Sequence, residues 1–256
     1  MQQSIETYEQ AIHYLFSRIN YERLHGELYT VGDFKLDRMA RLLSLLGDPH
    51  ERLPVVHVAG SKGKGSTAAM IAAMLGAAGR RVGLFTSPHI DAFEERMTVD
   101  GISPSPAELV ELLNPVANAV TAMGGEPGHL SPTYFELATA LAWRYFDERA
   151  VDVAVIEVGL GGRLDATNVC RPTVSVITSI SRDHTRLLGG ELSEIAREKG
   201  GIIRPGVPVV SGAEPAEARR AIEVICREHG TSLWQLGREI NCTGHDGPAG
   251  SPRRVD

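Results

Sequence analysis

The chain has 256 residues, of which 43% are apolar and 23% are charged, a balance typical of folded globular proteins and unlike that of disordered chains. Its 26 basic and 32 acidic residues give a net charge of −6, so no overall positive charge favours nucleic acid. Three cysteines without a C-x-x-C pair exclude a disulfide framework and a thiolate zinc site. Without a signal-peptide pattern or a run of about 18 apolar residues, we expect a cytoplasmic protein that binds small molecules, not nucleic acid or membranes.

Segments with the apolar spacing of helices alternate with short β-rich runs along most of the chain. In chain order, helices are predicted at residues 5–19, 35–46, 66–78, 106–122, 132–147 and 214–229. Strands are predicted at residues 55–59, 82–85, 151–158, 174–178, 207–210 and 232–236. Because strands that alternate with helices form parallel sheets, and such strands are apolar throughout, we predict an α/β fold with a largely parallel sheet flanked by helices.

The composition changes near the end of the chain. Residues 1–240 are predicted to form one domain, without an internal repeat. From Asn241 onward Gly, Pro, Ser, Asp and Arg replace most apolar residues, which predicts a disordered tail at 241–256.

The turn at residues 60–67 has the sequence GSKGKGST and joins the first predicted strand to a helix. Its three glycines let backbone N–H groups converge, Lys64 adds a positive charge, and the helix adds its positive dipole end. This pattern predicts a phosphate-binding loop, although the lysine precedes the third glycine instead of following it. The alternative is a βα connection whose glycines serve close packing, but two lysines in such a cradle repel each other unless an anion is bound.

Three polar residues follow apolar strands at the edge where α/β sheets place ligands: Ser87, Glu157 and His184. With phosphate oxygens and water they can complete an octahedral shell for magnesium, although histidine suits manganese better. Burying the carboxylate of Glu157 within a strand of valines favours a nearby cation, with a structural ion pair as the alternative. Taken alone, Ser87 fits an ordinary turn and His184 fits a structural histidine.

Six segments in this order and spacing resemble the folylpolyglutamate synthase and dihydrofolate synthase family of the Mur ligase superfamily. They are VAGSKGKGST, LFTSPHI with FEERM, TYFELATA, EVGLGGRLDATN, ISRDHTRLLG and IAREKGGIIRPG. The resemblance covers about residues 30–236 and implies the P-loop NTPase-like fold of the Mur ligase central domain. It also implies an ATP- and magnesium-dependent ligase that adds L-glutamate to a folate or to dihydropteroate through an acyl phosphate.

By motif position, the resemblance implies residues for each part of the site. ATP contacts fall on Lys62, Gly63, Lys64, Gly65, Ser66 and Thr67, and one or two magnesium ions on Ser87, Glu157 and His184. Pterin-side contacts fall on Thr133, Phe135, Glu136, Arg163, Leu164, Asp165 and Ala166, and less firmly on residues 32–35. Phe135 is equally consistent with a place in the core. The implied catalytic residues are Lys64, His184 and Lys199.

Lys199 matches the position at which the family carries a carbamylated lysine. A lysine that is partly desolvated in a cleft loses its proton more readily, and the neutral amine can take up carbon dioxide to become an anion that supports a second metal. Without the resemblance, a solvated lysine near a helix C-terminus is the simpler interpretation.

The family's chains continue well beyond the matched segments, and nothing after Leu236 resembles that continuation. We therefore expect the C-terminal glutamate-ligase domain to be absent and the chain to be a monomer. The hypotheses are an active ligase, with dihydropteroate or tetrahydrofolate as acceptor, or a nucleotide- and pterin-binding fragment without turnover. An unrelated phosphotransferase is less favoured, because a generic kinase has no reason to carry Lys199 together with the run EVGLGGRLDATN. A cell-wall Mur ligase is less favoured, because the run GLGGRLDATN indicates the folate branch.

Overall fold

The centre of the molecule is a seven-stranded sheet in the computed structural model, which describes residues 4–21, 36–124 and 131–241. The strands lie in the order β3-β2-β4-β1-β5-β6-β7. Their bounds are Val55–Ala59 (β1), Val82–Phe85 (β2), Met97–Val99 (β3), Val153–Glu157 (β4), Val174–Ile177 (β5), Val209–Ser211 (β6) and Leu233–Gln235 (β7). All neighbouring strands are parallel except β2 and β3, so the predicted α/β fold with a largely parallel sheet is confirmed.

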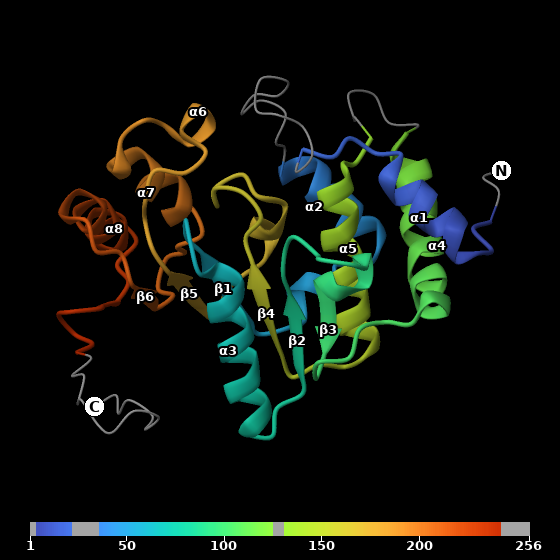
Figure 1. Ribbon diagram of the computed structural model, residues 1–256, viewed down its shortest axis with the longest axis horizontal. Coiled ribbons are helices and arrows are strands. Elements are labelled where there is room, and N and C mark those ends of the chain that lie inside the picture. Colours follow the sequence, from blue (N-terminus) through green and yellow to red (C-terminus); the bar gives the residue numbers. More distant parts are fainter. Residues whose placement is uncertain (1–3, 22–35, 125–130, 242–256) are drawn as a thin grey trace.

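Helices cover both faces of this sheet (Figure 1). Their bounds are Tyr8–Phe16 (α1), Leu36–Leu45 (α2), Lys64–Ala77 (α3), Pro106–Met123 (α4), Tyr134–Glu148 (α5), Thr185–Leu188 (α6), Leu192–Gly200 (α7) and Ala216–Glu228 (α8). Short 3-10 turns cover Pro49–Glu51, Phe93–Arg96 and Ala166–Val169. None of the helices within the described ranges combines the length and the apolar character that a membrane crossing needs. The predicted contact at residues 32–35 and the predicted tail after Asn241 lie outside the described residues.

Successive side chains of β1 point to opposite faces of the sheet, so they belong to different clusters of the apolar core. Val58 packs with Ala68 of α3, whereas Val55 belongs to the cluster that holds α1, α2, α4 and α5, and Ala59 to the cluster of α7 and α8. In the described residues, α3 is the one helix whose side chains join the cluster around Val58. Its outer side chains Met70 and Met74 are exposed. The core is therefore deep on one face of the sheet and thin on the face that α3 covers.

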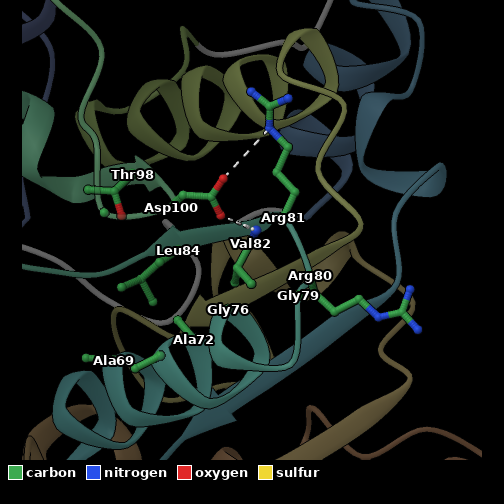
Figure 2. Close-up of a pocket in the computed structure, with 12 residues that line it drawn as sticks. Ala69, Ala72, Gly76, Gly79, Arg80, Arg81, Val82, Leu84, Thr98 and Asp100 are labelled. Carbon is green, nitrogen blue, oxygen red and sulfur yellow. Dashed lines mark hydrogen bonds and ion pairs between the residues drawn. The ribbon is translucent and has the colours of Figure 1, made fainter.

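A cavity of about 740 Å³ lies between α3 and strands β2 and β3 (Figure 2). Small side chains of α3 such as Ala69 and Ala72 form one wall, and Arg80 and Arg81 lie at its rim. Asp100 accepts a hydrogen bond from the backbone N–H of Val82 at 2.9 Å and lies 4.0 Å from Arg81. Because Gly76 and Gly79 also line it, this cavity lies at the end of α3 opposite to residues 60–67.

Capping interactions explain where the long helices begin. A capping box begins α4, since the Ser105 N–H donates to Glu108 at 2.8 Å. The helix predicted at residues 132–147 begins later, because Thr133 and Glu136 form the box of α5 in place of Ser131 and Pro132. The start of α3 also differs from the prediction near Ser66, since its N-cap is Gly63.

The sequence did not predict β3 or α6, and it indicated α7 only through the helix end expected near Lys199. The strand β3 has three residues and the helix α6 has four, so neither is long enough to show a period. Strand bounds also shift, since the strands expected at residues 151–158 and 207–210 are β4 and β6. These short elements depend on contacts distant in sequence, such as the antiparallel pairing of β3 with β2.

Gly83 in β2 offers a test of the packing between β2 and α5. A Cβ there would lie 2.7 Å from the ring of Phe146, so we expect Gly83→Ala to lower the free energy of unfolding by about 1–3 kcal/mol. A Cβ at Gly76 would meet nothing within 4 Å, so Gly76→Ala in α3 is expected to raise it by about 0.5–1 kcal/mol. Urea titrations of both variants measure the difference, and effects of the same sign would contradict this packing.

Candidate functional site

The phosphate loop, residues 60–67, lies at the carboxyl end of β1, where the chain turns into α3. Gly60 and Gly63 have φ of +152° and +78°, and a Cβ at Gly60 would lie 1.9 Å from the Thr178 hydroxyl. Because Gly63 is the N-cap of α3, the helix begins inside the loop. Its first backbone N–H groups have no partners within the helix, which is the geometry that binds anions.

Polar residues directly after β5 hold the phosphate loop from the side. The hydroxyls of Thr178 and Ser179 donate to the carbonyl oxygen of Lys62 at 2.7 and 3.1 Å. The Ser61 hydroxyl donates to the carbonyl oxygen of Ser181 and accepts its N–H, both at 3.0 Å. These residues were not predicted as part of the site, although a polar run that directly follows a buried strand indicates such a role.

Glu157 ends β4 and is only 4% exposed. Its Oε2 accepts the N–H of Ser87 at 3.0 Å, and a Cβ at Gly65 would lie 3.1 Å from the same oxygen. Burial raises the pKa of Glu157, while the Ser87 hydrogen bond and the positive charge of Lys64 oppose that rise. The structure thus places a buried carboxylate beside the phosphate loop, with Ser87 next to it.

This donor set fits a hard divalent cation. Carboxylate and hydroxyl oxygens are the ligands that magnesium prefers, and a cation would lower the free energy of the buried Glu157 carboxylate. The described part of the chain contains no group of three or more His, Cys, Asp and Glu side chains arranged around a metal position. A metal ion here would therefore depend on phosphate oxygens and water as well as on Glu157 and Ser87.

His184 is held in a left-handed backbone conformation at the start of α6, with φ of +46°. Its Nε2 lies 3.5 Å from an oxygen of Asp183, and about half of its side chain is exposed. An exposed imidazole beside a carboxylate remains accessible to a ligand.

Lys199 lies in the last turn of α7, and only 2% of its surface is exposed. Its Nζ donates to the carbonyl oxygen of Gly60 at 2.9 Å and lies 3.9 Å from Asp183. Burial lowers the pKa of Lys199 to about 8, and the positive charge of Lys64 contributes to that fall. The alternative of a solvated lysine is therefore wrong, because the amine is buried against the phosphate loop.

Two of the predicted pterin-side residues, Thr133 and Glu136, already have partners in the fold. Glu136 accepts the N–H and the hydroxyl of Thr133 at 2.7 and 2.8 Å, and pairs with the buried Arg38 at 2.8 Å. Phe135 packs against the main core cluster, with its ring centroid 5.9 Å from that of Phe85, and it also adjoins Gly159, where a Cβ would lie 2.5 Å from its ring. Of these three side chains, the ring of Phe135 is the one that adjoins a glycine-rich turn.

That turn, residues 159–163, is called the glycine loop below, and it packs against the end of α7. A Cβ at Gly162 would lie 2.8 Å from the carbonyl oxygen of Lys199. The Arg163 N–H donates to the carbonyl oxygen of Glu198 at 2.9 Å, and the two side chains form an ion pair. Leu164 lines a small hollow beside α6, whereas Asp165 and Ala166 are buried.

The buried amine of Lys199 predicts a pH dependence of stability. Its pKa is about 8 in the folded protein against a usual value of 10.5, so the unfolded chain holds more protons between these values. Raising the pH from about 8 to about 10.5 is therefore expected to stabilise the protein relative to Lys199→Met, by about 3 kcal/mol. Urea titrations in buffer free of carbon dioxide, at both ends of this window, measure it. Equal pH dependence in both proteins would contradict the burial of an amine that is only partly compensated.

Curated relatives of this chain are dihydrofolate and folylpolyglutamate synthases. It is 43% identical over 214 residues to the dihydrofolate synthase/folylpolyglutamate synthase of Bacillus subtilis, and 40% identical over 214 residues to the folylpolyglutamate synthase of Lacticaseibacillus casei. These matches cover 83% and 84% of this chain but 50% of each relative. The chain thus spans about half the length of the curated relatives it matches.

Solved structures show the same fold. An FPGS–AMPPCP–folate complex superposes with a TM-score of 0.83 at 39% identity, over 91% of this chain and 55% of that one. Escherichia coli FolC in complex with DHPP and ADP gives a TM-score of 0.81 at 35% identity, over 96% of this chain and 55% of that one. The family model of the Mur ligase middle domain matches residues 58–210, a span that includes the phosphate loop, Glu157 and Lys199. The chain belongs to the Mur ligase family, of which it carries the middle domain.

Proposed function

We propose that this chain acts in an ATP- and magnesium-dependent ligase that adds L-glutamate to a folate or to dihydropteroate. The observation that carries the proposal is the meeting of the phosphate loop, Glu157 and Lys199 at one edge of the sheet. The synthases with this fold and about 40% identity support the choice of substrates.

In this proposal, ATP lies on the phosphate loop. Backbone N–H groups at the start of α3 hold the phosphate oxygens, with contacts from Lys62, Gly63, Lys64, Gly65, Ser66 and Thr67. Magnesium would supply positive charge to the phosphates, and Glu157, Ser87 and His184 would hold it. Because Glu157 is buried next to Gly65, its carboxylate is held beside the phosphate loop.

The chemistry needs an activated acceptor, because a carboxylate is inert toward amines. Its oxygen attacks the γ-phosphorus of ATP, the bond to the β-phosphate oxygen breaks, and ADP leaves. The glutamate amine then attacks the acyl carbon, the bond from that carbon to the phosphate oxygen breaks, phosphate leaves, and the nitrogen releases a proton to give the amide. Lys64 and the positive end of α3 stabilise the negative charge on the transferred group, while the remaining catalysis is positioning.

We assign the acceptor's pterin side to the glycine loop and the start of α5. Phe135 supplies an aromatic surface next to Gly159, and Arg163 and Leu164 lie at the accessible edge of the loop. The other residues of this set are buried: Thr133, Glu136, Asp165 and Ala166.

The function is tested by incubating the 256-residue chain with ATP, magnesium, glutamate and either dihydropteroate or tetrahydrofolate. We expect ADP and a glutamylated product detected by mass spectrometry, and Lys64→Ala is expected to reduce kcat/KM about 100-fold because a charge-stabilising group is lost. Arg80→Ala, at the far end of α3, is the matched control and should retain activity.

Loss of ADP formation and loss of ATP binding would lead to different conclusions. Because the chain spans half of its relatives, binding of ATP and acceptor without ADP formation would favour a binding domain that needs the remaining half. Failure to bind ATP in calorimetry would overturn the proposal altogether.

We further propose that Lys199 becomes a carbamate. The neutral amine attacks carbon dioxide, an N–C bond forms, one proton is released, and the remaining N–H can still donate to Gly60. With ¹³C-labelled bicarbonate, we expect a carbamate signal in the carbon NMR spectrum that is lost in Lys199→Met. The control Lys62→Met, which removes an exposed amine, should keep the signal, and a signal that survives in Lys199→Met would contradict the assignment.

A further inference from the structure

The side chain of Asn168 bridges two segments of the candidate site that lie far apart in the chain. Asn168 belongs to the 3-10 turn that follows the glycine loop, and only 3% of its surface is exposed. Its Nδ2 donates to the carbonyl oxygen of Arg163 at 2.9 Å and to that of Gly201 at 3.1 Å. Arg163 ends the glycine loop and Gly201 is the C-cap of α7, so one amide group joins both segments. The proposed reaction assigns Asn168 no role.

Arg204, in the turn after α7, fixes the orientation of this amide. Its Nη2 donates to the backbone oxygen of Asn168 at 2.7 Å and to the side-chain oxygen Oδ1 at 2.9 Å. Because a guanidinium only donates and a carbonyl oxygen only accepts, Oδ1 of Asn168 must face Arg204, and the NH2 group must face the two carbonyl oxygens. Both hydrogens of the amide are therefore used inside the fold.

These contacts act on the C-terminus of α7, where the last carbonyl oxygens have no partners within the helix. Asn168 binds the oxygen of Gly201, and the N–H of Arg163 donates to the oxygen of Glu198 at 2.9 Å. Nη1 of Arg204 lies 3.4 Å from the oxygen of Gly201, so its positive charge faces the negative end of the helix dipole. The last turn of α7 is thus held by polar groups from outside the helix.

The packing between the glycine loop and α7 leaves little room for this turn to shift. A Cβ at Gly162 would lie 2.8 Å from the carbonyl oxygen of Lys199, and a Cβ at Gly201 would lie 2.4 Å from the side chain of Arg163. The two backbones therefore approach each other directly. Because Lys199 lies two residues before Gly201, the hydrogen bond from Asn168 helps to set where the side chain of Lys199 leaves the helix.

Lys199 needs this support because its surroundings disfavour a buried charge. Its amine lies beneath the phosphate loop, and only 2% of the residue is exposed. Lys64 and Lys62 disfavour its positive charge, whereas Asp183 and Asp165 favour it. A buried cation gains free energy by moving into water, and the backbone that carries it must resist that movement.

We propose that Asn168 and Arg204 are positioning residues, which hold the last turn of α7 so that the amine of Lys199 stays buried beneath the phosphate loop. This inference rests on the proposed function for its catalytic meaning, since Lys199 serves that reaction. It rests on the contacts alone for its structural meaning. Both residues act on Lys199 through the backbone of α7.

The variant Asn168→Ala tests this role through the pH dependence of stability that arises from Lys199. Raising the pH from about 8 to about 10.5 is expected to lower the unfolding equilibrium constant of the wild type about 100-fold relative to Lys199→Met. Without the bridging amide the amine can reach water and regain its usual pKa. We therefore expect less than about a fivefold change for Asn168→Ala relative to Asn168→Ala/Lys199→Met. A purely structural role would weaken the fold equally at both pH values and leave the 100-fold change intact, which would overturn the proposal.

Asn114→Ala is the matched control. The amide of Asn114 also joins two segments, since it donates to the backbone oxygen of Ile5 at 2.8 Å and accepts the N–H of Ile5 at 3.0 Å. This variant is expected to lose stability and to keep the 100-fold change. Loss of that change in Asn114→Ala would overturn the proposal, because general loosening would then explain the result.

A pair of variants at Arg204 decides the question if Asn168→Ala fails to fold. Arg204→Met removes the donor that orients the amide, and we expect it to lose the pH-dependent change. Arg204→Lys keeps a positively charged donor, and we expect it to retain most of the change. The described charges that shift the pKa of Lys199 do not include Arg204, so a loss in Arg204→Met reports position and not charge. A change that survives in Arg204→Met would overturn the proposal.

Labelled bicarbonate links the same variants to the proposed function. At pH 8 the carbamate signal of Lys199 is expected to weaken at least about fivefold in Asn168→Ala, because less of the amine is neutral, and to persist in Asn114→Ala. An undiminished signal in Asn168→Ala would overturn the proposal. If the wild type neither binds ATP nor forms a carbamate, the proposed function fails, whereas the unfolding measurements still decide whether Asn168 and Arg204 position Lys199. Equal pH dependence of the wild type and Lys199→Met would overturn the inference itself.

Discussion

The rest of the site depends on one buried contact, in which the amine of Lys199 donates to the carbonyl oxygen of Gly60. A cation is expensive to bury, and Lys62 and Lys64 lie close enough to disfavour its charge further. The contact persists because Asp183 and the backbone carbonyl offer partial compensation. An anion on the phosphate loop would relieve the same repulsion, so the protein is organised to gain electrostatic stabilisation from binding a phosphate.

Glu157 is a buried acid next to Gly65 of the phosphate loop, whereas Lys199 is a buried base next to Gly60. Burial raises the pKa of the Glu157 carboxyl, and backbone N–H groups and the positive charge of Lys64 partly offset the cost of burying the carboxylate. A divalent cation between this acid and bound phosphates would satisfy both. The positive and negative groups of the site are thus each under-compensated in the protein alone, and ATP together with magnesium would supply the missing charges.

The sequence allowed the sheet, the long helices and the phosphate loop to be predicted, because each leaves a local pattern of apolar period or glycine spacing. It did not place β3, α6 and α7, or the hydrogen bonds by which residues 178–181 hold the phosphate loop, since these features depend on tertiary contacts. Two capping signals competed at the start of α5, and the pair of Thr133 and Glu136 formed the box because Glu136 also pairs with buried Arg38. The resemblance implied Asp165 as an acceptor contact, but its burial and its bonds to the N–H groups of Leu160 and Thr167 could not be predicted from the sequence, since they depend on the folded turn after β4.

The distance of 3.1 Å between a would-be Cβ at Gly65 and the Glu157 carboxylate has a consequence for how the protein can vary. A side chain at position 65 must displace the acid, while a shorter acid at position 157 would open space above the glycine. The two positions therefore share one volume, and the cost of a substitution at either depends on the residue at the other. Gly65 and Glu157 therefore form a single unit of mutational change, although the strands β2 and β3 and the helices α4 and α5 lie between them in the chain.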